Sequence, residues 1–566
     1  MADARQLIIC SDGTNNNVTG GKEDTNVVKM LKLLTPDNNN QVLFYDPGVG
    51  NAGELPGTTL WDKARRFYGR VEGLALGRGI YENIAEAYLF LMRSYRPGDQ
   101  IYFFGFSRGA FTARCIAGLV NQFGILRPSM ECMVPTLLHV YFSRRDSDED
   151  KERNKLTTAQ IKESFCSEVQ QQVPIRFVGV WDTVASVGMP PFDLKITALP
   201  TIQGKQFQHV RQALALDEHR APFLPRPYTD ANGDFKNTGQ TMKQLWFRGS
   251  HCDVGGGYAA EASALSDKPL VWLLAEAAKL EQGLRLCYGG RDLRDESAIE
   301  AAWQESRRAQ LTKEAGKIHA VPYSTCLWAV AGLRLRDPSH VAVDGREPVL
   351  VTPEEHASVT ATAMRFPDNT VWVQTRPYGL LIILTLFGVL AYFAMGQSLV
   401  PWEGGSSGFD DLVRAAARLP EFAQANTAFA AWQLTWWSDE TGLGGFTRFR
   451  SPFAALTVDF VFIGCYAYAF SWFFVKAFAR MAGLTRTNRP ERLWLNRVGH
   501  SLLVLVLADV AENLLTLLVI GMLAHSNFVA GVVAVVMSLA AVVKLIALAV
   551  VIVFVLLAYV KKPKGV

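Results

Sequence analysis

One short segment of the chain has the composition that a nucleophilic serine requires. Gly105-Phe-Ser-Arg-Gly109 fits the pattern G-x-S-x-G, in which small residues stand two positions before and after the serine. The pattern follows the apolar run 101–104 and precedes an amphipathic helical pattern at 110–122. This order predicts a strand, a tight turn and a helix, with the hydroxyl of Ser107 exposed at the turn. The alternative is an ordinary Gly-Ser turn in a loop.

A serine nucleophile needs a general base. In chains whose nucleophile lies in a G-x-S-x-G turn, this base is a histidine late in the sequence. His251 stands out because it follows the apolar run 245–247 and precedes three glycines, 255–257, that allow close approach of the backbone to the turn at Ser107. A histidine in an ordinary glycine turn is the alternative. The other candidates have weaker settings, in a helical pattern, in charged stretches or without nearby glycines: His139, His209, His219, His319, His340 and His356.

The acid that orients the base should lie between the serine and the histidine along the chain. Asp182 ends the apolar run 175–181 and meets this requirement, so we predict it as the acid. Asp217 and Asp253 are rivals. Asp253 is only two residues from His251, and we expect it to support the loop rather than to orient the base.

An oxyanion hole needs two main-chain N–H groups, one of which comes from the residue after the nucleophile, here Arg108. We expect the second from the loop that follows the first apolar run, at Asp12, Gly13 or Thr14. The same loop resembles the D-x-D-G-T motif of haloacid-dehalogenase-type phosphatases. Cys10 occupies the position of their nucleophilic aspartate, which argues against that reading.

These residues follow a series of short apolar runs that alternate with helical patterns. We expect strands at 7–10, 42–45, 101–104, 175–181 and 245–247, and helices at 26–34, 80–95, 110–122, 134–142 and 270–280. Continuous apolar strands separated by helices are typical of a mostly parallel sheet covered on both faces, with ligands at the carboxyl ends of the strands. The charge run 146–153 reads as a solvated linker.

The chain resembles the α/β-hydrolase-type phospholipases typified by the first class of type VI secretion lipase effectors. The matching stretches lie between about residues 5 and 280: 11–17, 45–50, 79–84, 105–110, 179–184, 213–218 and 246–258. The resemblance implies an α/β-hydrolase-like domain and a bacterial lipid-cleaving serine hydrolase, with Ser107, Asp182 and His251 as its triad.

The C-terminal part departs from those effectors. The whole chain of 566 residues is 49% hydrophobic and only 19% charged, and the apolar excess lies after residue 370. Long apolar stretches predict about four transmembrane helices, at 378–396, 457–475, 501–524 and 528–560, with a loop at 397–453 that carries amphipathic helices. We therefore expect a catalytic domain at 1–370 and an α-helical membrane domain at 371–566.

Basic residues predict how the membrane domain is oriented. The segment between the second and third expected spans carries six Lys or Arg residues and one acid, and three lysines follow the fourth span. Because basic loops stay in the cytoplasm, both termini and the catalytic domain are expected there, at a bacterial inner membrane. The partners we expect are the bilayer and a phospholipid substrate. An oligomer, a regulatory protein or an immunity protein is left open.

Other classes of function are less favoured by the sequence. The net charge of +4 is too small for a nucleic-acid binder, and the eight cysteines form no C-x-x-C pair. No motif predicts a cofactor or a metal. A different function stays open: a channel or transporter regulated by a catalytically silent hydrolase-like domain, motivated by Asp509, Glu512 and Lys544 within the expected spans. Ion pairs that hold a helical hairpin are the simpler explanation for those charges.

Overall fold

A computed structural model describes most of the first 307 residues and the C-terminal helices. The described residues are 4–13, 23–35, 40–48, 78–143, 147–184, 186–187, 194–195, 206–228, 241–307, 318–319, 330–336, 340–341, 349–350, 354–356, 452–485, 489–523 and 527–560. The chain divides into two compact units, one formed by residues 1–321 and 336–371, the other by 322–335 and 372–566.

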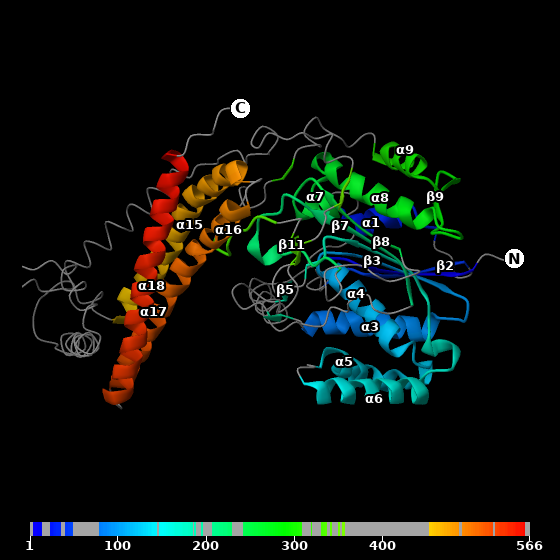
Figure 1. The fold of residues 1–566 in the computed structure, drawn as a ribbon, viewed down its shortest axis with the longest axis horizontal. Helices are drawn as coiled ribbons and strands as arrows, with labels where there is room; N and C mark the ends of the chain where they lie inside the picture. Colours follow the sequence, from blue (N-terminus) through cyan, green and yellow to red (C-terminus); the bar gives the residue numbers. More distant parts are fainter. Residues whose placement is uncertain are drawn as a thin grey trace, which may run out of the picture. The chain divides into compact units, whose positions relative to one another are not determined.

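The first unit is built on a parallel sheet of seven strands (Figure 1). The strand order is β13-β8-β7-β4-β3-β1-β2, and every neighbouring pair is parallel. The strands are β1 (Gln6–Ser11), β2 (Gln41–Asp46), β3 (Gln100–Phe106), β4 (Ile175–Trp181), β7 (Phe207–Ala215), β8 (Thr241–Phe247) and β13 (Glu354–Glu355). The chain leaves β1 toward one edge and β3 toward the other, so the order reverses between these two strands. Parallel sheets bind ligands at such a reversal.

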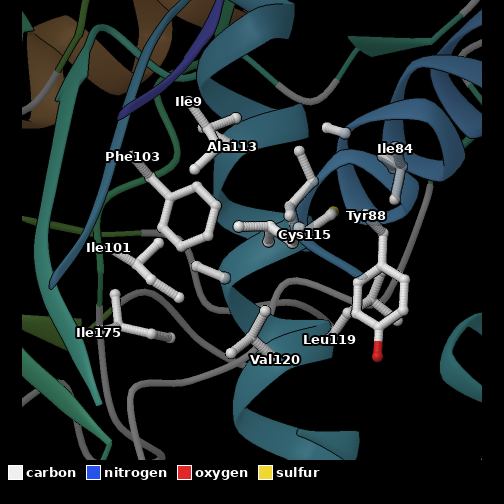
Figure 2. Packing of buried hydrophobic residues seen from close by; sticks show 14 of the residues in the cluster. Ile9, Ile84, Tyr88, Ile101, Phe103, Ala113, Cys115, Leu119, Val120 and Ile175 are labelled. Atoms are coloured by element: carbon white, nitrogen blue, oxygen red, sulfur yellow. The ribbon is translucent and has the colours of Figure 1, made fainter. Parts of the chain in front are cut away.

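Helices cover both faces of the sheet, as its continuous apolar strands require (Figure 1). One face packs against α3 (Arg78–Ser94), α4 (Arg108–Phe123), α5 (Val134–Phe142) and α6 (Asp148–Phe165). The other packs against α1 (Asn26–Leu31), α8 (Asp267–Ala278) and α9 (Glu296–Arg307), with the short α7 (His251–Gly255) at the end of β8. Figure 2 shows the first core, where Ile9, Ile101, Phe103 and Ile175 from the strands lie on one side of α4 and Tyr88 lies on the other.

Short antiparallel pairs complete the described part of this unit. They are β5 (Ser186–Val187) with β6 (Leu194–Lys195), β9 (Leu286–Tyr288) with β10 (Arg291–Leu293), and β11 (His340–Val341) with β12 (Val349–Leu350). The 3-10 turns are Pro128–Met133, Val169–Gln171, Ala221–Phe223, Ala260–Ala262 and Ala264–Ser266. The mostly parallel α/β class predicted from the sequence is confirmed.

Two parts of the sequence prediction are wrong. The charge run 146–153 is not a linker along its length, because α6 begins at Asp148; Ser147 caps the helix and accepts the N–H of Asp150. The second error is that β7 is not predicted. This central strand contains polar residues although most of it is buried. Arg211 in this strand is compensated by Glu276 of α8, with Nε 2.6 Å from Oε2.

The described part of the second unit contains four helices: α15 (Pro452–Thr485), α16 (Arg489–Val498), α17 (Ser501–Leu523) and α18 (Asn527–Val560). The segment 330–335 packs with them, because Leu333 donates its N–H to the carbonyl of Gly499 and Leu335 donates to Oδ1 of Asn496. Lys544 of α18 lies 3.0 Å from Oδ1 of Asp509 and 2.6 Å from Oε2 of Glu512, both on α17. These contacts favour the explanation that the charges hold a helical hairpin.

Fewer of the described helical stretches are long and apolar enough to cross a bilayer than the sequence predicts. Two apolar helical stretches are long enough, Leu493–Leu515 and Leu539–Ala558, whereas Ile463–Phe478 within α15 is shorter. A core helix of a soluble protein can have the same length and composition. On α18, however, large apolar side chains are exposed, including Leu539 at 51%, Ile546 at 60% and Leu556 at 60%. The expected span 378–396 and the loop 397–453 lie outside the described residues.

Candidate active site

Ser107 stands between β3 and α4 in a strained backbone conformation. Its φ is 59° and its ψ is −123°, and α4 begins at the next residue, Arg108. Among the described residues, three that are not glycine have a positive φ: Ser107, Asp182 and Gln282. Such strain gathers at functional sites, because surrounding contacts must hold the residue in place. Two of the three residues are those that the sequence singled out as nucleophile and acid.

The two glycines that flank Ser107 are required by close backbone contacts. A Cβ atom added at Gly105 would lie 2.5 Å from the carbonyl oxygen of Gly109. One added at Gly109 would lie 2.2 Å from the carbonyl oxygen of Ser11 and 2.3 Å from that of Asp12. The turn therefore packs directly against the end of β1, and only glycine fits at either position.

Asp182 follows the last residue of β4 and has a φ of 41°. Its carboxylate is completely buried and receives hydrogen bonds on both oxygens. The N–H of Ala215 donates to Oδ1 over 2.9 Å, and Nδ1 of His251 lies 2.6 Å from Oδ2. The guanidinium of Arg336 contributes two further bonds, at 2.6 Å to Oδ1 and 2.9 Å to Oδ2.

His251 is the first residue of α7 and follows its N-cap Ser250, a short turn after the end of β8. Its main-chain N–H donates to Oε2 of Glu218 over 3.1 Å. Its ring packs against two aromatic rings, with centroids 4.6 Å from Phe106 and 5.0 Å from Phe223. Contacts therefore fix the backbone of His251, the Nδ1 atom of its imidazole and the position of its ring.

The free side of the imidazole is its Nε2 atom. This atom is buried and has no hydrogen-bond partner among the described residues. Because a proton on Nδ1 bonds to Asp182, the neutral ring presents a lone pair at Nε2. Phe106, whose ring packs against the imidazole at a tilt of 32°, directly precedes Ser107 in the chain. Nε2 is thus an available proton acceptor close to the turn.

Main-chain hydrogen bonds tie the turn at Ser107 to the residues on either side of Asp182. The N–H of Ser107 donates to the carbonyl of Trp181 over 3.1 Å, and the N–H of Val184 donates to the carbonyl of Ser107 over 3.3 Å. The structure therefore brings Ser107, Asp182 and His251 together at the carboxyl ends of β3, β4 and β8.

The rival acids are engaged elsewhere. Asp217 binds Arg248, with Oδ2 2.7 Å from Nε, and also accepts the N–H of Gly249. Asp253 accepts the N–H and hydroxyl of Ser250 and lies 2.6 Å from Nδ1 of His319. This bonding places Asp253 as a support of the loop that carries His251.

Two of the three residues expected to supply an oxyanion donor from the loop after β1, Asp12 and Gly13, are described, and the N–H groups of both are engaged. The N–H of Asp12 donates to the carbonyl of Asp46 over 2.9 Å, and the N–H of Gly13 donates to Oδ1 of Asp12 over 2.7 Å. Both donors are therefore occupied, which corrects the expectation for these two residues. Thr14 lies outside the described residues. The N–H of Arg108, as the first of α4, has no acceptor within the helix and keeps its predicted role open.

Burial and neighbouring charges shift the titration of these groups. Burial alone would raise the pKa of Asp182, but the guanidinium of Arg336 and the imidazole of His251 bring it below its ordinary value of 3.8. Burial lowers the pKa of His251 below 6.5, although Asp182 opposes the shift. The pair therefore combines an ionised acid with a neutral imidazole at neutral pH. Burial also raises the pKa of Asp12 to about 6 and lowers that of Arg108 to about 10.

Two residues of this site, Arg336 and Glu218, were not singled out from the sequence, and His319 was considered only as a weaker candidate for the base. Arg336 and Glu218 bind the acid and the backbone of the base, and His319 binds Asp253. Their partners lie far away in sequence, 154 residues for Arg336 with Asp182, so no local pattern indicates them. Within the described residues, no group of three or more His, Cys, Asp or Glu side chains is arranged to hold a metal.

Comparison with known proteins agrees with the resemblance seen in the sequence. Residues 5–276 match the family model described as "T6SS, Phospholipase effector Tle1-like, catalytic domain". A Saccharomyces cerevisiae protein, described as "Uncharacterized protein YEL023C", is 34% identical over 241 residues. That alignment covers 40% of this chain and 34% of the yeast protein, so the chain spans about a third of that relative's length.

All three residues of the predicted triad lie inside the matched segment, whereas Arg336 lies beyond it. The match confirms the resemblance: residues 5–276 are similar to the catalytic domain of the Tle1-like phospholipase effectors of type VI secretion.

Proposed function

We propose that the protein is a serine hydrolase that cleaves ester bonds of membrane phospholipids, with Ser107 as nucleophile, His251 as base and Asp182 as the acid. The observation that carries the proposal is the bond between His251 Nδ1 and Asp182 Oδ2, which leaves Nε2 unpartnered beside the strained turn of Ser107. The match to a phospholipase effector domain supports the substrate class.

In the first half of the reaction, Nε2 of His251 accepts the hydroxyl proton as Oγ of Ser107 attacks the ester carbonyl. The N–H of Arg108 donates to the oxyanion of the tetrahedral intermediate. The bond to the leaving oxygen then breaks, and His251 returns its proton to the departing alcohol or lysolipid. An acyl group remains on Ser107.

In the second half, His251 removes a proton from water, which attacks the acyl carbonyl. Collapse of the second intermediate returns the proton to Ser107 and releases the fatty acid. Throughout, the carboxylate of Asp182 holds the imidazole in the required tautomer and stabilises its charged form.

The second unit would anchor the enzyme in the membrane that holds its substrate. The exposed apolar side chains of α18 support this role, since tethering raises the effective concentration of enzyme at the bilayer. We place the catalytic domain on the cytoplasmic side of a bacterial inner membrane, from the basic segment around α16.

The test is labelling with a fluorophosphonate, which reacts with activated serines, followed by mass spectrometry of the lipids in treated membranes. Wild type should be labelled and should release lysolipid or fatty acid. Ser107→Ala should lose labelling, and both Ser107→Ala and His251→Ala should lose hydrolysis by about 10⁴-fold or more. Both variants should remain folded and membrane-bound.

A wild-type protein that is neither labelled nor active on membranes would contradict the proposal and favour the silent-domain alternative. Labelling that persists in Ser107→Ala would place the nucleophile elsewhere. Ser250→Ala is a matched control, because Ser250 is also buried and directly precedes His251 but its hydroxyl binds Asp253.

A further inference from the structure

Arg336 makes four hydrogen bonds at the end of the sheet where the candidate triad lies. Its Nη1 donates to Oδ1 of Asp182 over 2.6 Å and to the carbonyl of Ala215 over 2.7 Å. Its Nη2 donates to Oδ2 of Asp182 over 2.9 Å and to the carbonyl of Phe223 over 2.6 Å. The side chain is only 2% exposed, so the guanidinium forms a buried two-pronged clamp on the carboxylate.

The clamp decides which way the carboxylate of Asp182 faces. With Ala215 and Arg336 on Oδ1, and His251 and Arg336 on Oδ2, four donors surround the two oxygens. That number matches what an ionised carboxylate accepts. Rotation of the group would break two planar bonds to the guanidinium, so Oδ2 stays directed at the imidazole.

The same guanidinium also holds a wall of the imidazole pocket. Phe223, whose carbonyl accepts from Nη2, packs edge-on against the ring of His251. Ala215 is the last residue of β7, and its N–H binds Asp182 as well. Arg336 therefore connects the acid, the end of a central strand and the aromatic wall of the base.

Arg336 comes from a part of the chain that the family match does not include. The match ends at residue 276. Arg336 is also the first residue that rejoins the catalytic unit, since residues 322–335 belong to the unit of the apolar helices. Its neighbour Leu335 is bound there by the side chain of Asn496.

We propose that Arg336 is a positioning residue of the hydrolase, which keeps Asp182 ionised and directed at His251 and is supplied from outside the family's catalytic domain. The inference rests on the proposed function, because it assigns a role within the same triad. Arg336 itself touches neither Ser107 nor any reacting atom in this role; it acts through Asp182.

The charge of Arg336 has a consequence for the pH dependence. The guanidinium favours the ionised form of Asp182, so its removal makes the pair of Asp182 and His251 hold a proton more tightly. The protonated pair is no base, and the acidic limb of the kcat/KM profile should therefore move to higher pH. The other charged groups that face His251, Glu218 and Arg220, form their own bidentate pair and stay in place. Burial raises the pKa of the neighbouring Cys252 to about 12, so it stays neutral.

The test compares full-length wild type, Arg336→Met and Arg336→Lys in detergent, by ester hydrolysis and by fluorophosphonate labelling rates from acidic to alkaline pH. We expect Arg336→Met to lower kcat/KM about 100-fold at neutral pH, with the acidic limb raised by about one pH unit and partial recovery at alkaline pH. Arg336→Lys keeps the charge but not the fork and should fall in between.

Arg211→Met is the matched control, because it removes another buried guanidinium from the sheet, one that pairs with Glu276 instead of Asp182. It should lower thermal stability without moving the acidic limb. If Arg336→Met behaves like this control, the residue is only structural and the inference is overturned.

A double variant keeps the test decisive if Arg336→Met folds poorly. Asp182→Asn with Arg336→Met removes both buried charges together, which is tolerated better than removing one. It should lose little activity beyond Asp182→Asn alone, because Arg336 acts chiefly through the carboxylate and its bond to the carbonyl of Phe223 only supports the wall of the pocket. A further multiplicative loss in the double variant would overturn the inference. A wild type without Ser107-dependent labelling would overturn the proposed function, and this inference with it.

Discussion

Nδ1 of His251 lies 2.6 Å from Oδ2 of Asp182, although 69 residues separate them in the chain. A second histidine–aspartate pair includes Asp253, two residues after His251: Nδ1 of His319 lies 2.6 Å from Oδ1 of Asp253. Among the described residues, only the first pair includes a histidine whose other nitrogen is buried without a hydrogen-bond partner. The two pairs give opposite expectations for two similar substitutions.

Asp182→Asn should reduce kcat by about 10⁴-fold, because an amide at this position favours the wrong histidine tautomer. Asp253→Asn should retain most activity per folded molecule and chiefly reduce thermal stability, since Asp253 supports the loop through Ser250 and His319. Steady-state kinetics and thermal unfolding of both variants check this. An active Asp182→Asn beside an inactive Asp253→Asn would show that the acid is misassigned.

Gly109→Ala should destabilise the protein by about 1–3 kcal/mol and reduce activity, because the new methyl group meets main-chain oxygens of Ser11 and Asp12 that cannot easily move. Gly464→Ala is the control, since a Cβ there meets nothing within 4 Å. Thermal unfolding and fluorophosphonate labelling provide the two readouts. Equal stability of the two variants would contradict the tight packing of the turn.

The acidic limb of the kcat/KM profile should lie below pH 6.5. Burial lowers the pKa of His251 from that value, and a base with a lowered pKa stays neutral, and so active, to lower pH. A pH–rate profile of the wild type with a soluble ester measures the limb. A limb well above 6.5 would mean that the charge of Asp182 outweighs burial at His251.

Lys544→Met should destabilise the helical hairpin of α17 and α18, because Asp509 and Glu512 would lose their cation. Neutralising all three, by adding Asp509→Asn and Glu512→Gln, should recover much of the loss. Thermal unfolding in detergent measures both effects. Loss of ester hydrolysis in a variant that remains fully folded would argue that these charges do more than hold the hairpin.

The orientation of the second unit is testable by cysteine labelling of intact cells, or spheroplasts where an outer membrane is present. In a background without native cysteines, Asn527→Cys at the start of α18 should react with a membrane-impermeant reagent, and Thr485→Cys at the end of α15 should not. The reverse pattern would place the basic segment around α16, and the side we assign to the catalytic domain, outside.

The sequence predicts those parts of the fold whose side chains are uniform in character. The expected strand 175–181 has the same bounds as β4, because all its residues except Arg176 are apolar and buried. The expected helix 134–142 likewise has the bounds of α5. The strand β7 was missed because His209, Arg211 and Gln212 interrupt its apolar pattern. Their polarity is satisfied by tertiary partners, such as Glu276 for Arg211, which no local pattern reveals.

In the candidate site, too, the sequence predicts what is set by local residues but not what is set by tertiary contacts. Gly105 and Gly109 identify Ser107 because the constraint on the turn is local. The order of strands then brings Asp182 and His251 to the same edge of the sheet. Arg336 could not be predicted, because its two-pronged bond to Asp182 depends on the path of the chain between the two residues. The hydrogen bonds of the Asp12 and Gly13 N–H groups could not be predicted either, because they depend on the position of Asp46 and on the rotamer of the Asp12 side chain.

The pairing of Asp182 with Arg336 affects when the candidate site can fold during synthesis. The ribosome releases Ser107, Asp182 and His251 before Arg336, and domains begin to fold during synthesis. Until Arg336 appears, the buried carboxylate lacks its cation, so closing that end of the sheet is unfavourable. Truncated chains that end before and after residue 336 should therefore differ in labelling of Ser107. The proposed hydrolase would therefore acquire its full activity late in translation, after residue 336 has been synthesised.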